Sequence, residues 1–385
     1  MYIYDENSRQ ALDEQIIDEL ITRACAKLKY QLRSFANQYP AACSVDGQYP
    51  LTPNTDWTTG FWSGITGLAW KLSGDSFYAS QLAQQVDSFR SRLAIRHELD
   101  THDLGFLYSL SCVNAWRFMG NQDARKAALG AADLLIARYL PTAGIIQAWG
   151  NLDDPEQRGR MIIDCLMNLP LLYWATKETG DAGYAACARS HARQAMNYLM
   201  RSDYSTYHTF YMDAGTGAPL RGGTHQGFAD DSCWARGQAW AIYGFALSYR
   251  ETGDSRFLQA AINAARYFLC HLPEDQICYW DLSLTAPDTP KDSSAAVIAV
   301  CGLLELVNFL SILDPQREQF IRQALNITTE LIHHYFDGRS DASGYLKHAV
   351  YNLNKERGVD EYSIWGDYFF FELLSRLKNP LNRYW

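Results

Sequence analysis

Apolar residues recur at helical spacing along most of the chain. In residues 184–199 and 257–268, alanine-rich segments place apolar side chains three and four positions apart, as in helices with one buried face. Residues 239–247 and 295–310 are instead apolar nearly all round. A helix that is apolar on every side is enclosed on every side, so these segments predict inner helices surrounded by amphipathic ones.

Short turn signals separate the helical patterns at five places. The upstream pattern typically ends with a glycine, which accepts a left-handed backbone, and the Asp, Asn or Asp-Pro that follows can cap the next helix. The five signals are residues 72–75, 119–123, 178–181, 251–254 and 312–316. The sequence therefore predicts repeated pairs of helices joined by tight turns.

The spacing of the turn signals indicates how the pairs assemble. The signals lie roughly 45 to 75 residues apart, more than in solenoid repeats, and the excess falls in loops rich in Gly, Trp, His and Asp. We predict an all-α fold, an (α/α)6 barrel in which residues 1–385 form a single domain. Residues 207–212 and 276–281 are expected to add short strands, and the long loops should hold the chemistry.

Composition and charge exclude several classes of partner. The chain has 385 residues, of which 48% are apolar, and a net charge of −9 with scattered Lys and Arg. These properties predict a large core and argue against nucleic acid or a membrane surface as a partner. The first residues are polar and acidic, unlike a secretory signal, and residues 295–310 are too short to span a bilayer.

The cysteines and histidines bear on compartment and cofactors. The nine cysteines form no C-x-x-C pair and lie mostly in apolar segments. This pattern predicts free thiols in a reducing compartment and therefore a cytoplasmic protein. The sequence contains no zinc-ligand spacing, phosphate-binding loop, dinucleotide fingerprint or nucleophile elbow. We expect neither a metal nor a cofactor.

Aromatic residues make up 14% of the chain, and many stand beside Gly, Asp, Asn or Arg. Flat aromatic faces near polar groups suit sugar rings, whereas the alternative is that large aromatic residues fill a large core. Clustering favours the first interpretation at four places, each of which is expected to precede or open a helix. The clusters are residues 54–64, 101–106, 145–150 and 221–240.

Asp164 is the carboxylate that most strongly suggests chemistry. It lies in the otherwise apolar residues 161–172 and not at an obvious helix start. Burial penalises a charged carboxylate, so such a group either pairs with a partner or keeps its proton at a raised pKa. A protonated acid in a dry site is a proton donor. If the inner helices begin at one rim, Asp164 and the four clusters meet around a single pocket.

Asp103 is the second candidate carboxylate. It stands before the apolar residues 104–110, where an ordinary helix cap is the alternative role. Two carboxylates in one dry pocket oppose each other's ionisation, so one would donate a proton while the other stays charged. Acid/base chemistry is the predicted reaction type. Four other aspartates remain rivals for these roles: Asp56, Asp230, Asp231 and Asp367.

Arg236 and His208 are the other polar candidates. Arg236 stands between Trp234 and Trp240, where a planar cation among aromatic faces suits a carboxylated sugar. An internal ion pair with one of the rival aspartates is the alternative. His208 is interpreted as a hydrogen-bonded structural histidine rather than a base.

Taken together and in order, these motifs resemble those of the unsaturated glucuronyl hydrolases, glycoside hydrolase family 88. The resemblance runs nearly end to end. It is carried by residues 54–57, 102–110, 144–150, 162–165, 221–227 and 364–367.

The resemblance implies both a fold and a reaction. It implies an α/α barrel of six hairpins that removes the Δ4,5-unsaturated uronic acid left by polysaccharide lyases at the non-reducing end of oligosaccharides. In the family an aspartate, here Asp164, protonates C4 of the vinyl ether and assists addition of water at C5. The unstable hemiketal then opens and releases the sugar. Asp103 would be the second essential carboxylate.

The resemblance also implies a set of residues that line the uronate subsite. These are Trp57, His102, Trp149, His208, Gly222, Thr224, Gln226, Arg236 and Trp240. Family members that prefer sulfated fragments use a stretch with Ser and Lys ahead of residues 364–367. Here residues 351–358 lack the serines but retain Lys355 and Arg357, so either a sulfate contact or a solvated loop is possible.

The predicted ligands are unsaturated uronate-containing oligosaccharides, from di- to tetrasaccharides and preferably of glycosaminoglycan type. The protein itself would be a monomer or a homodimer. Two alternatives stay open: an unsaturated rhamnogalacturonyl hydrolase on the same barrel, and a sugar-binding protein without catalysis.

Overall fold

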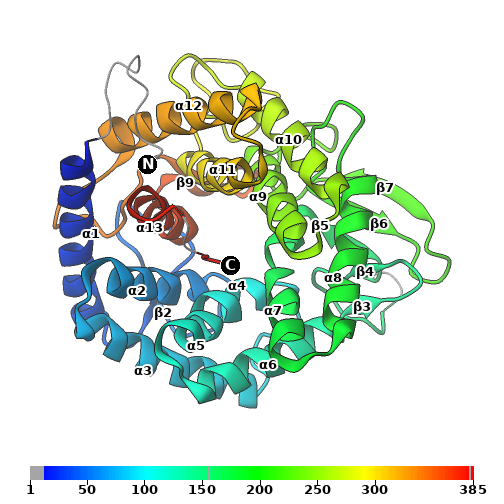
Figure 1. Ribbon diagram of the computed structural model, residues 1–385, viewed down its shortest axis with the longest axis horizontal. Coiled ribbons are helices and arrows are strands. Elements are labelled where there is room, and N and C mark those ends of the chain that lie inside the picture. Colours follow the sequence, from blue (N-terminus) through cyan, green and yellow to red (C-terminus); the bar gives the residue numbers. More distant parts are fainter. Residues whose placement is uncertain (1–12, 155–156, 381–382) are drawn as a thin grey trace.

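Two concentric layers of helices form a closed ring in the computed structural model, which describes residues 13–154, 157–380 and 383–385 (Figure 1). The inner layer contains α2 (Thr59–Ser73), α4 (Leu104–Tyr108), α5 (Asn114–Met119), α7 (Pro170–Thr179), α9 (Ala235–Thr252), α11 (Ser293–Leu306) and α13 (Ile364–Lys378). The outer layer contains α1 (Glu14–Ser34), α3 (Ser76–Ala94), α6 (Gln122–Ile136), α8 (Ala182–Gln194), α10 (Ser255–Cys270) and α12 (Pro315–Glu330). The predicted (α/α)6 barrel is confirmed.

Hydrophobic patterning explains which helices lie inside. Every residue of α9 from Ala235 to Ser248 is buried, as is nearly all of α11, whereas α10 buries mainly the apolar positions of one face. Residues 239–247 are therefore enclosed, as predicted. The predicted helix at 295–310 ends earlier, because α11 stops at Leu306 and a 3-10 turn, η4 (Val307–Phe309), follows.

The turn signals act as predicted. Gly74, Gly120, Gly180 and Gly253 end inner helices with a left-handed backbone, at φ of 69°, 66°, 79° and 67°. The next residue caps the outer helix: Asp75, Asn121, Asp181 and Asp254 each accept a hydrogen bond from a backbone N–H of its first turn. Asp314 caps α12 in the same way. Each signal therefore reverses the chain from the inner layer to the outer one.

The ring closes between segments from opposite ends of the sequence. Helix α1 packs against α13, and Nζ of Lys378 lies 2.9 Å from a carboxylate oxygen of Glu14 and 2.8 Å from one of Asp18. The helix formed by α4 and α5 is continuous through a π-helical turn, η1 (Ser109–Val113). Similar turns, η3 (Ala195–Leu199) and η5 (Leu331–Tyr335), end α8 and α12.

Short antiparallel strands are added to the ring of helices. The pairs are β1 (Tyr39–Pro40) with β2 (Leu51–Thr52), β3 (Tyr139–Leu140) with β4 (Ile145–Ile146), and β8 (Ala349–Asn352) with β9 (Arg357–Glu361). A 3-10 turn, η6 (Leu353–Lys355), joins the last two strands. A three-stranded sheet consists of β5 (Arg160–Ile162), β6 (Thr209–Met212) and β7 (Pro219–Gly223). The strand expected within 207–212 is confirmed as β6.

The prediction of a strand at 276–281 is wrong. This segment forms only isolated bridges, from Tyr279 to Lys291 and from Asp281 to Trp234. Its residues Cys278 and Trp280 are buried. The apolar residues of this segment are therefore explained by burial against the barrel, and no neighbouring strand pairs with them to form a ladder. Within the described residues, no helix combines the length and the apolar character that crossing a membrane requires.

Aromatic side chains fill the barrel axis. Phe106 contacts Trp57, Trp240 and Trp385, with ring centroids 5.7, 5.4 and 5.9 Å apart, and Trp385 stacks on Phe369 at 6.0 Å. The C-terminal end of the chain enters the ring (Figure 1), and the Trp385 side chain is buried there. The high aromatic content therefore serves the core first, and only some of these rings are left for a ligand.

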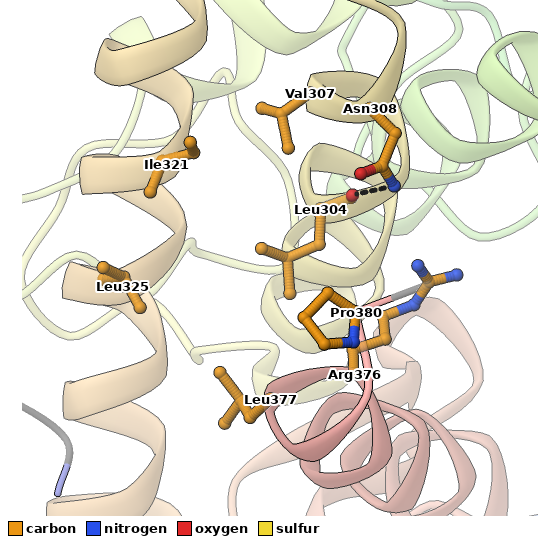
Figure 2. Close-up of a pocket in the computed structure, with 8 residues that line it drawn as sticks. All are labelled: Leu304, Val307, Asn308, Ile321, Leu325, Arg376, Leu377 and Pro380. Carbon is orange, nitrogen blue, oxygen red and sulfur yellow. Dashed lines mark hydrogen bonds between the residues drawn. The ribbon is translucent and has the colours of Figure 1, made fainter. Parts of the chain in front are cut away.

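An apolar pocket lies where α11 and α13 end, against the side of α12 (Figure 2). Its lining residues are Leu304, Val307, Asn308, Ile321, Leu325, Arg376, Leu377 and Pro380. The polar groups among them are engaged: the Asn308 amide donates to the Leu304 carbonyl at 3.0 Å, and Arg376 pairs with Glu305 and Glu372 at 3.0 and 2.9 Å. This pocket offers apolar surface rather than acid/base chemistry.

Candidate active site

The predicted clusters meet where the inner helices begin, at the opposite end from the apolar pocket. Trp57, just before α2, stacks on Trp365 of α13 at 5.8 Å, and Arg236 of α9 pairs with Asp292, the residue before α11, at 3.0 Å. The main-chain N–H of Phe106 in α4 donates to the Asn168 side chain at 2.7 Å. The first turns of the inner helices thus contact one another around the barrel axis.

Residues 145–150 reach this end in a different way from the one predicted. They do not open a helix, because they include β4, and the next element along the described residues is β5. Trp149 forms a bridge with Thr101, and the His102 N–H donates to the Ala148 carbonyl at 2.7 Å. A strand-like contact therefore brings Trp149 beside residues 101–103.

Asp164 lies in the first turn of η2 (Ile163–Met167), a 3-10 helix that leads into α7, so a helix does start here. Its neighbours Ile163 and Cys165 are fully buried, while Asp164 keeps partial exposure. Oδ1 of Asp164 is buried and has no hydrogen-bond partner within the described parts of the chain. Burial, and then the charge of Asp103, raises the pKa of Asp164 to about 7, against an opposing effect of Arg236. Asp164 is therefore suited to hold a proton near neutral pH.

Asp103 occupies the N-cap position of α4, but its side chain makes no capping hydrogen bond. One carboxylate oxygen instead accepts from the Thr101 hydroxyl at 2.7 Å, and the other lies 3.4 Å from Nε2 of His102. The cap interpretation is therefore wrong for the side chain. Burial raises the pKa of Asp103 to about 7, although the Thr101 hydroxyl favours the charged form.

His102 is buried, and burial lowers its pKa to about 3, with the positive charge of Arg138 acting in the same direction. The imidazole is therefore neutral. With one N–H to donate, it is placed to support the Asp103 carboxylate rather than to act as a cation beside it.

A glycine lets the two carboxylate-bearing segments approach. At Gly105 in α4, an added Cβ would lie 2.3 Å from Cα and 2.5 Å from the carbonyl oxygen of Asn168, just after η2. These are backbone atoms that cannot rotate away. Gly105 therefore permits the close contact between the start of α4 and η2 that places Asp103 near Asp164.

Replacing Gly105 with alanine is expected to force these segments apart. We expect the free energy of unfolding to fall by about 1–3 kcal/mol, as for overpacked cores, measured by urea denaturation. Gly215→Ala is the matched control, because its Cβ would meet only Asp213 Oδ1, at 3.4 Å. The control should stay within ~0.5 kcal/mol of the parent chain. Equal stability of the two variants would contradict the close-approach argument.

His208 and the loop that follows β7 form one hydrogen-bonded unit. Nδ1 of His208 accepts from the backbone N–H groups of His225 and Gln226 at 3.0 and 3.2 Å. Burial, together with nearby positive groups, holds the pKa of His208 well below its usual range. Nδ1 is therefore an acceptor in a neutral ring, as expected of a structural histidine.

Thr224 and Gly222 shape the same unit. The Thr224 hydroxyl accepts from the Gly227 N–H at 2.7 Å and lies 3.4 Å from Nδ1 of His208. At Gly222 in β7, any Cβ would meet the Tyr207 ring at 2.4 Å. These residues therefore fix the path of the loop that carries Gln226.

Arg236 is held by the protein itself. Nη1 donates to Asp292 and to the Val350 carbonyl, at 3.0 and 2.6 Å, while Nη2 donates to the side-chain oxygen of Gln226 and to the Tyr351 carbonyl, at 2.6 and 3.0 Å. The guanidinium also lies 4.4 Å from the Trp234 ring. The internal ion pair foreseen as the alternative exists, but its partner is Asp292 rather than any of the rival aspartates.

Trp57, Trp149 and Trp240 differ in how they face the site. Trp57 and Trp149 are partly exposed, and Nε1 of Trp57 donates to the Tyr351 hydroxyl at 3.3 Å. Trp240 is buried and packs on Phe106 and Phe369 at 5.4 and 5.5 Å. Trp57 and Trp149 can therefore offer faces to a ligand, while Trp240 supports the floor beneath them.

The rival aspartates have other tasks or none. Asp56 accepts from the N–H and the hydroxyl of Thr58, just before α2, at 3.0 and 2.9 Å, and Asp230 accepts from the Thr224 N–H at 2.8 Å. Asp367 accepts from two backbone N–H groups and the Tyr49 hydroxyl, while burial raises its pKa to about 6. Asp231 is exposed. None of these four presents a carboxylate like that of Asp164.

The hairpin of β8 and β9 covers one side of the site. Side-chain amides of Asn352 and Asn354 donate to the carbonyls of His225 and Gly227 at 3.3 and 2.7 Å. This segment is therefore anchored at two points, while residues 354–357 are exposed, so the alternative of a solvated loop for Lys355 and Arg357 stays open. Arg357 lies over the Tyr351 ring at 4.6 Å, whereas the Lys355 charge acts on His225.

Sequence reasoning missed several residues that organise the site. Asn168 and Thr101 position the two carboxyl-bearing segments, Asp292 pairs with Arg236, and Tyr351 contacts Trp57. Asp292 precedes two serines that open α11, so its position as a helix cap could have been predicted from the sequence. Its ion pair with Arg236 could not. In the described part of the chain, no group of three or more His, Cys, Asp or Glu side chains is placed to hold a metal ion.

Comparisons with known proteins place this arrangement in a family. The model of Glycosyl Hydrolase Family 88 matches residues 31–363. The chain is 46% identical to the unsaturated glucuronyl hydrolase of Bacillus sp. (strain GL1), over 92% of this chain and 94% of that protein. It is 41% identical to an unsaturated chondroitin disaccharide hydrolase of Streptococcus pneumoniae, over 97% and 95%.

A solved structure indicates the same family. The chain is similar to a variant of the unsaturated glucuronyl hydrolase from Streptococcus agalactiae in complex with dGlcA-GalNAc6S, with a TM-score of 0.88 and 38% identity. The match covers 99% of this chain and 96% of that one. Barrel, motifs and comparisons agree, and the chain therefore belongs to glycosyl hydrolase family 88 and is a glycosidase.

Proposed function

We propose that this protein removes the Δ4,5-unsaturated uronic acid from the non-reducing end of lyase-generated oligosaccharides, with glycosaminoglycan disaccharides as the preferred class. The observation that carries the proposal is the pair Asp103 and Asp164, two carboxyl groups with raised pKa values where the inner helices begin. Relatives that act on such substrates by name support it. The rhamnogalacturonyl and non-catalytic alternatives have no comparable support.

In this proposal Asp164 is the acid and then the base. Its protonated carboxyl group delivers the proton to C4 of the vinyl ether, and the resulting carboxylate takes a proton from the water that adds at C5. The product is a hemiketal at C5, which opens to a ketone and exposes a hemiacetal at C1, from which the next sugar departs. Among the residues that the structure describes, none forms a hydrogen bond with Oδ1 of Asp164, and this supports such a task.

Asp103 is proposed to hold substrate hydroxyl groups and to keep Asp164 protonated. The Thr101 hydroxyl stabilises the charged form of Asp103, and that charge raises the pKa of Asp164. The order of ionisation follows from these contacts: Asp103 loses its proton first, and Asp164 retains its own.

The uronate ring is proposed to lie between aromatic faces and the loop after β7. The proposed lining residues are Trp57, His102, Trp149, His208, Gly222, Thr224, Gln226, Arg236 and Trp240. For Arg236 we propose an indirect role: because it donates to the side-chain oxygen of Gln226, it turns the Gln226 amide N–H groups toward other acceptors, such as a uronate carboxylate.

Residues 1–385 are proposed to act as one catalytic domain, as a monomer or homodimer, without metal or cofactor. The expected substrates are di- to tetrasaccharides. A cytoplasmic location is proposed because all nine cysteines lie in described residues as free thiols.

Loss of ultraviolet absorbance by the conjugated alkene tests the proposed function. Unsaturated disaccharides from chondroitin and hyaluronan should lose this absorbance on incubation with the protein. Turnover of pectin-derived disaccharides alone would favour the rhamnogalacturonyl alternative. Binding of all these disaccharides without loss of absorbance would indicate a sugar-binding protein and overturn the proposal.

A further inference from the structure

Arg138, just after α6, is a buried cation, and it forms no ion pair within the described residues. It is 4% exposed. Its Nε donates to the Gln147 carbonyl at 3.0 Å, and Nη2 donates to the Gly150 carbonyl at 3.1 Å. Buried charges are normally paired, because a charge that leaves water loses much of its solvation. A neutral donor could hold two main-chain carbonyls, so the positive charge itself requires an explanation.

The two carbonyls that Arg138 holds belong to the loop that carries Trp149. The Gln147 N–H also donates to the Arg138 carbonyl, at 3.0 Å. The side-chain amide of Gln147 in turn donates to the carbonyls of Trp149 and Gly150, at 3.2 and 3.3 Å. Residues 147–150 are therefore held in place by a guanidinium and an amide, both of which are buried.

The same loop is paired with the residues that precede α4. Trp149 forms a bridge with Thr101, and the Ala148 carbonyl accepts from the His102 N–H at 2.7 Å. The Thr101 hydroxyl donates to the Asp103 carboxylate at 2.7 Å. The loop therefore links the guanidinium to Asp103, and a shift of the loop would move both the Trp149 ring and this carboxylate.

The two carboxyl groups of the site have different neighbouring cations. Burial raises the pKa of both groups, and Arg138 opposes this rise at Asp103 whereas Arg236 opposes it at the other carboxyl group, Asp164. Arg236 is neutralised by Asp292 at 3.0 Å, but Arg138 has only neutral hydrogen-bond partners within the described residues. An uncompensated charge acts over a longer distance in a low-dielectric interior. Of the two carboxyl groups, Asp103 is therefore the one beside a net positive charge.

Other groups near Asp103 do not supply the same charge. His102, with Nε2 at 3.4 Å, is neutral because burial lowers its pKa to about 3. Burial also raises the pKa of the Cys165 thiol, which is therefore uncharged. After burial and hydrogen bonding, Asp56 before α2 raises the pKa of Asp103 while Arg92 of α3 lowers it, so these two charges act against each other.

We propose that Arg138 is a positioning residue of the active site with two tasks: it braces residues 147–150 against residues 101–103, and its charge keeps Asp103 ionised while Asp164 holds the proton. This inference rests on the proposed function and concerns a residue that does not touch the substrate. The brace requires the forked donors of a guanidinium, whereas the second task requires only a cation. Substitution can therefore separate the two tasks.

Arg138→Lys and Arg138→Gln are the variants that separate them, because each can donate to one carbonyl but only lysine keeps the charge. Both lose the fork, so KM for an unsaturated chondroitin disaccharide should rise about three- to tenfold in both, as Trp149 loses support. In Arg138→Gln alone, the acidic limb of the pH profile of kcat/KM should move about 0.5–1 unit to higher pH, since Asp103 must be ionised to act.

Arg201→Gln is the matched control. Arg201 also holds main-chain carbonyls, those of Thr206 and Ser232 at 3.1 and 2.9 Å, but these lie outside residues 101–103 and 147–150. Its removal should leave the acidic limb where it is in the parent chain. The control therefore distinguishes a charge that acts on Asp103 from the general loss of a guanidinium that supports a loop.

Thermal unfolding gives a second measurement that needs no turnover. Burial raises the pKa of Asp103 to about 7, so the attraction between Arg138 and this carboxylate is weak at pH 5 and present at pH 8. The Tm deficit of Arg138→Gln relative to the parent should therefore widen by about 1–2 °C from pH 5 to pH 8. The widening should vanish when Asp103→Asn is present in both chains.

Separate outcomes would overturn each task. An acidic limb of Arg138→Gln that coincides with that of the parent, or a Tm deficit that is equal at both pH values, would overturn the role of the charge. A shifted limb in Arg138→Lys would do the same, even if Arg138→Gln did not fold. Unchanged KM in Arg138→Lys would overturn the brace. If the parent turned over no unsaturated disaccharide but the Tm deficit widened, the proposed function would fail and the link between Arg138 and Asp103 would stand.

Discussion

Replacing Asp164 with asparagine is expected to lower kcat on an unsaturated disaccharide about a thousandfold, within the range that positioned general acids contribute. Asparagine keeps the shape of the side chain but has no proton to deliver to C4. Binding of the disaccharide should persist, because no lining residue is removed. The measurements are loss of ultraviolet absorbance for turnover and titration calorimetry for binding.

The matched control for this variant is Asp231→Asn, which removes the same charge from an exposed loop position ahead of α9. It should retain the parent's kcat. If Asp164→Asn kept full activity, Asp164 would have no part in the mechanism. If Asp231→Asn lost activity to the same degree, the loss in both variants could not be assigned to the missing acid at Asp164.

Stability provides a second check on Asp164→Asn. The folded state raises the pKa of Asp164 from 3.8 to about 7, so the folded protein binds this proton more tightly than the unfolded chain does. The contribution of Asp164 to stability is therefore fully present below pH 4 and is lost as pH rises toward 7. Asparagine cannot ionise, so the Tm of the variant at pH 8 should equal or exceed that of the parent. A lower Tm would mean that the variant is inactive because it is damaged.

The barrel was predictable because its signals are local. Each inner-to-outer reversal depends on a glycine and a capping residue that adjoin in sequence, as at Gly180 and Asp181. The distinction between layers depends on periodicity within a single helix, as in α9 and α10. The strand expected at 276–281 fails because a ladder requires a neighbouring strand, which a local pattern cannot supply.

The candidate site was predictable in its residues but not in their pairing. Asp164 could be singled out because a carboxylate in an apolar run is costly wherever the run is placed. The partner of Arg236 could not be identified from the sequence, since Asp292 lies 56 positions away and is one of many aspartates. Asp103 was ambiguous for a related reason: its N-cap position is fixed by sequence, but its bond to Thr101 is decided by how the side chain turns.

Replacing Asp103 with asparagine should change both the rate and its pH dependence. Loss of a charged contact to substrate hydroxyl groups should lower kcat/KM roughly 10- to 100-fold. The charge of Asp103 also raises the pKa of Asp164, so its removal should lower that pKa. Because Asp164 must be protonated to act, the residual activity of the variant should decline at a lower pH than the decline of the parent near pH 7.

A pH profile of kcat/KM separates this explanation from a loss of packing. Asp123→Asn, which removes a charge from outer helix α6, should leave both the rate and the profile unchanged. A variant at Asp103 that lost activity equally at every pH would show that this carboxylate holds the substrate without influencing Asp164. A decline in activity at a higher pH than in the parent would mean that Asp103 lowers the pKa of Asp164 instead of raising it. The roles proposed for Asp103 and Asp164 would then have to be exchanged.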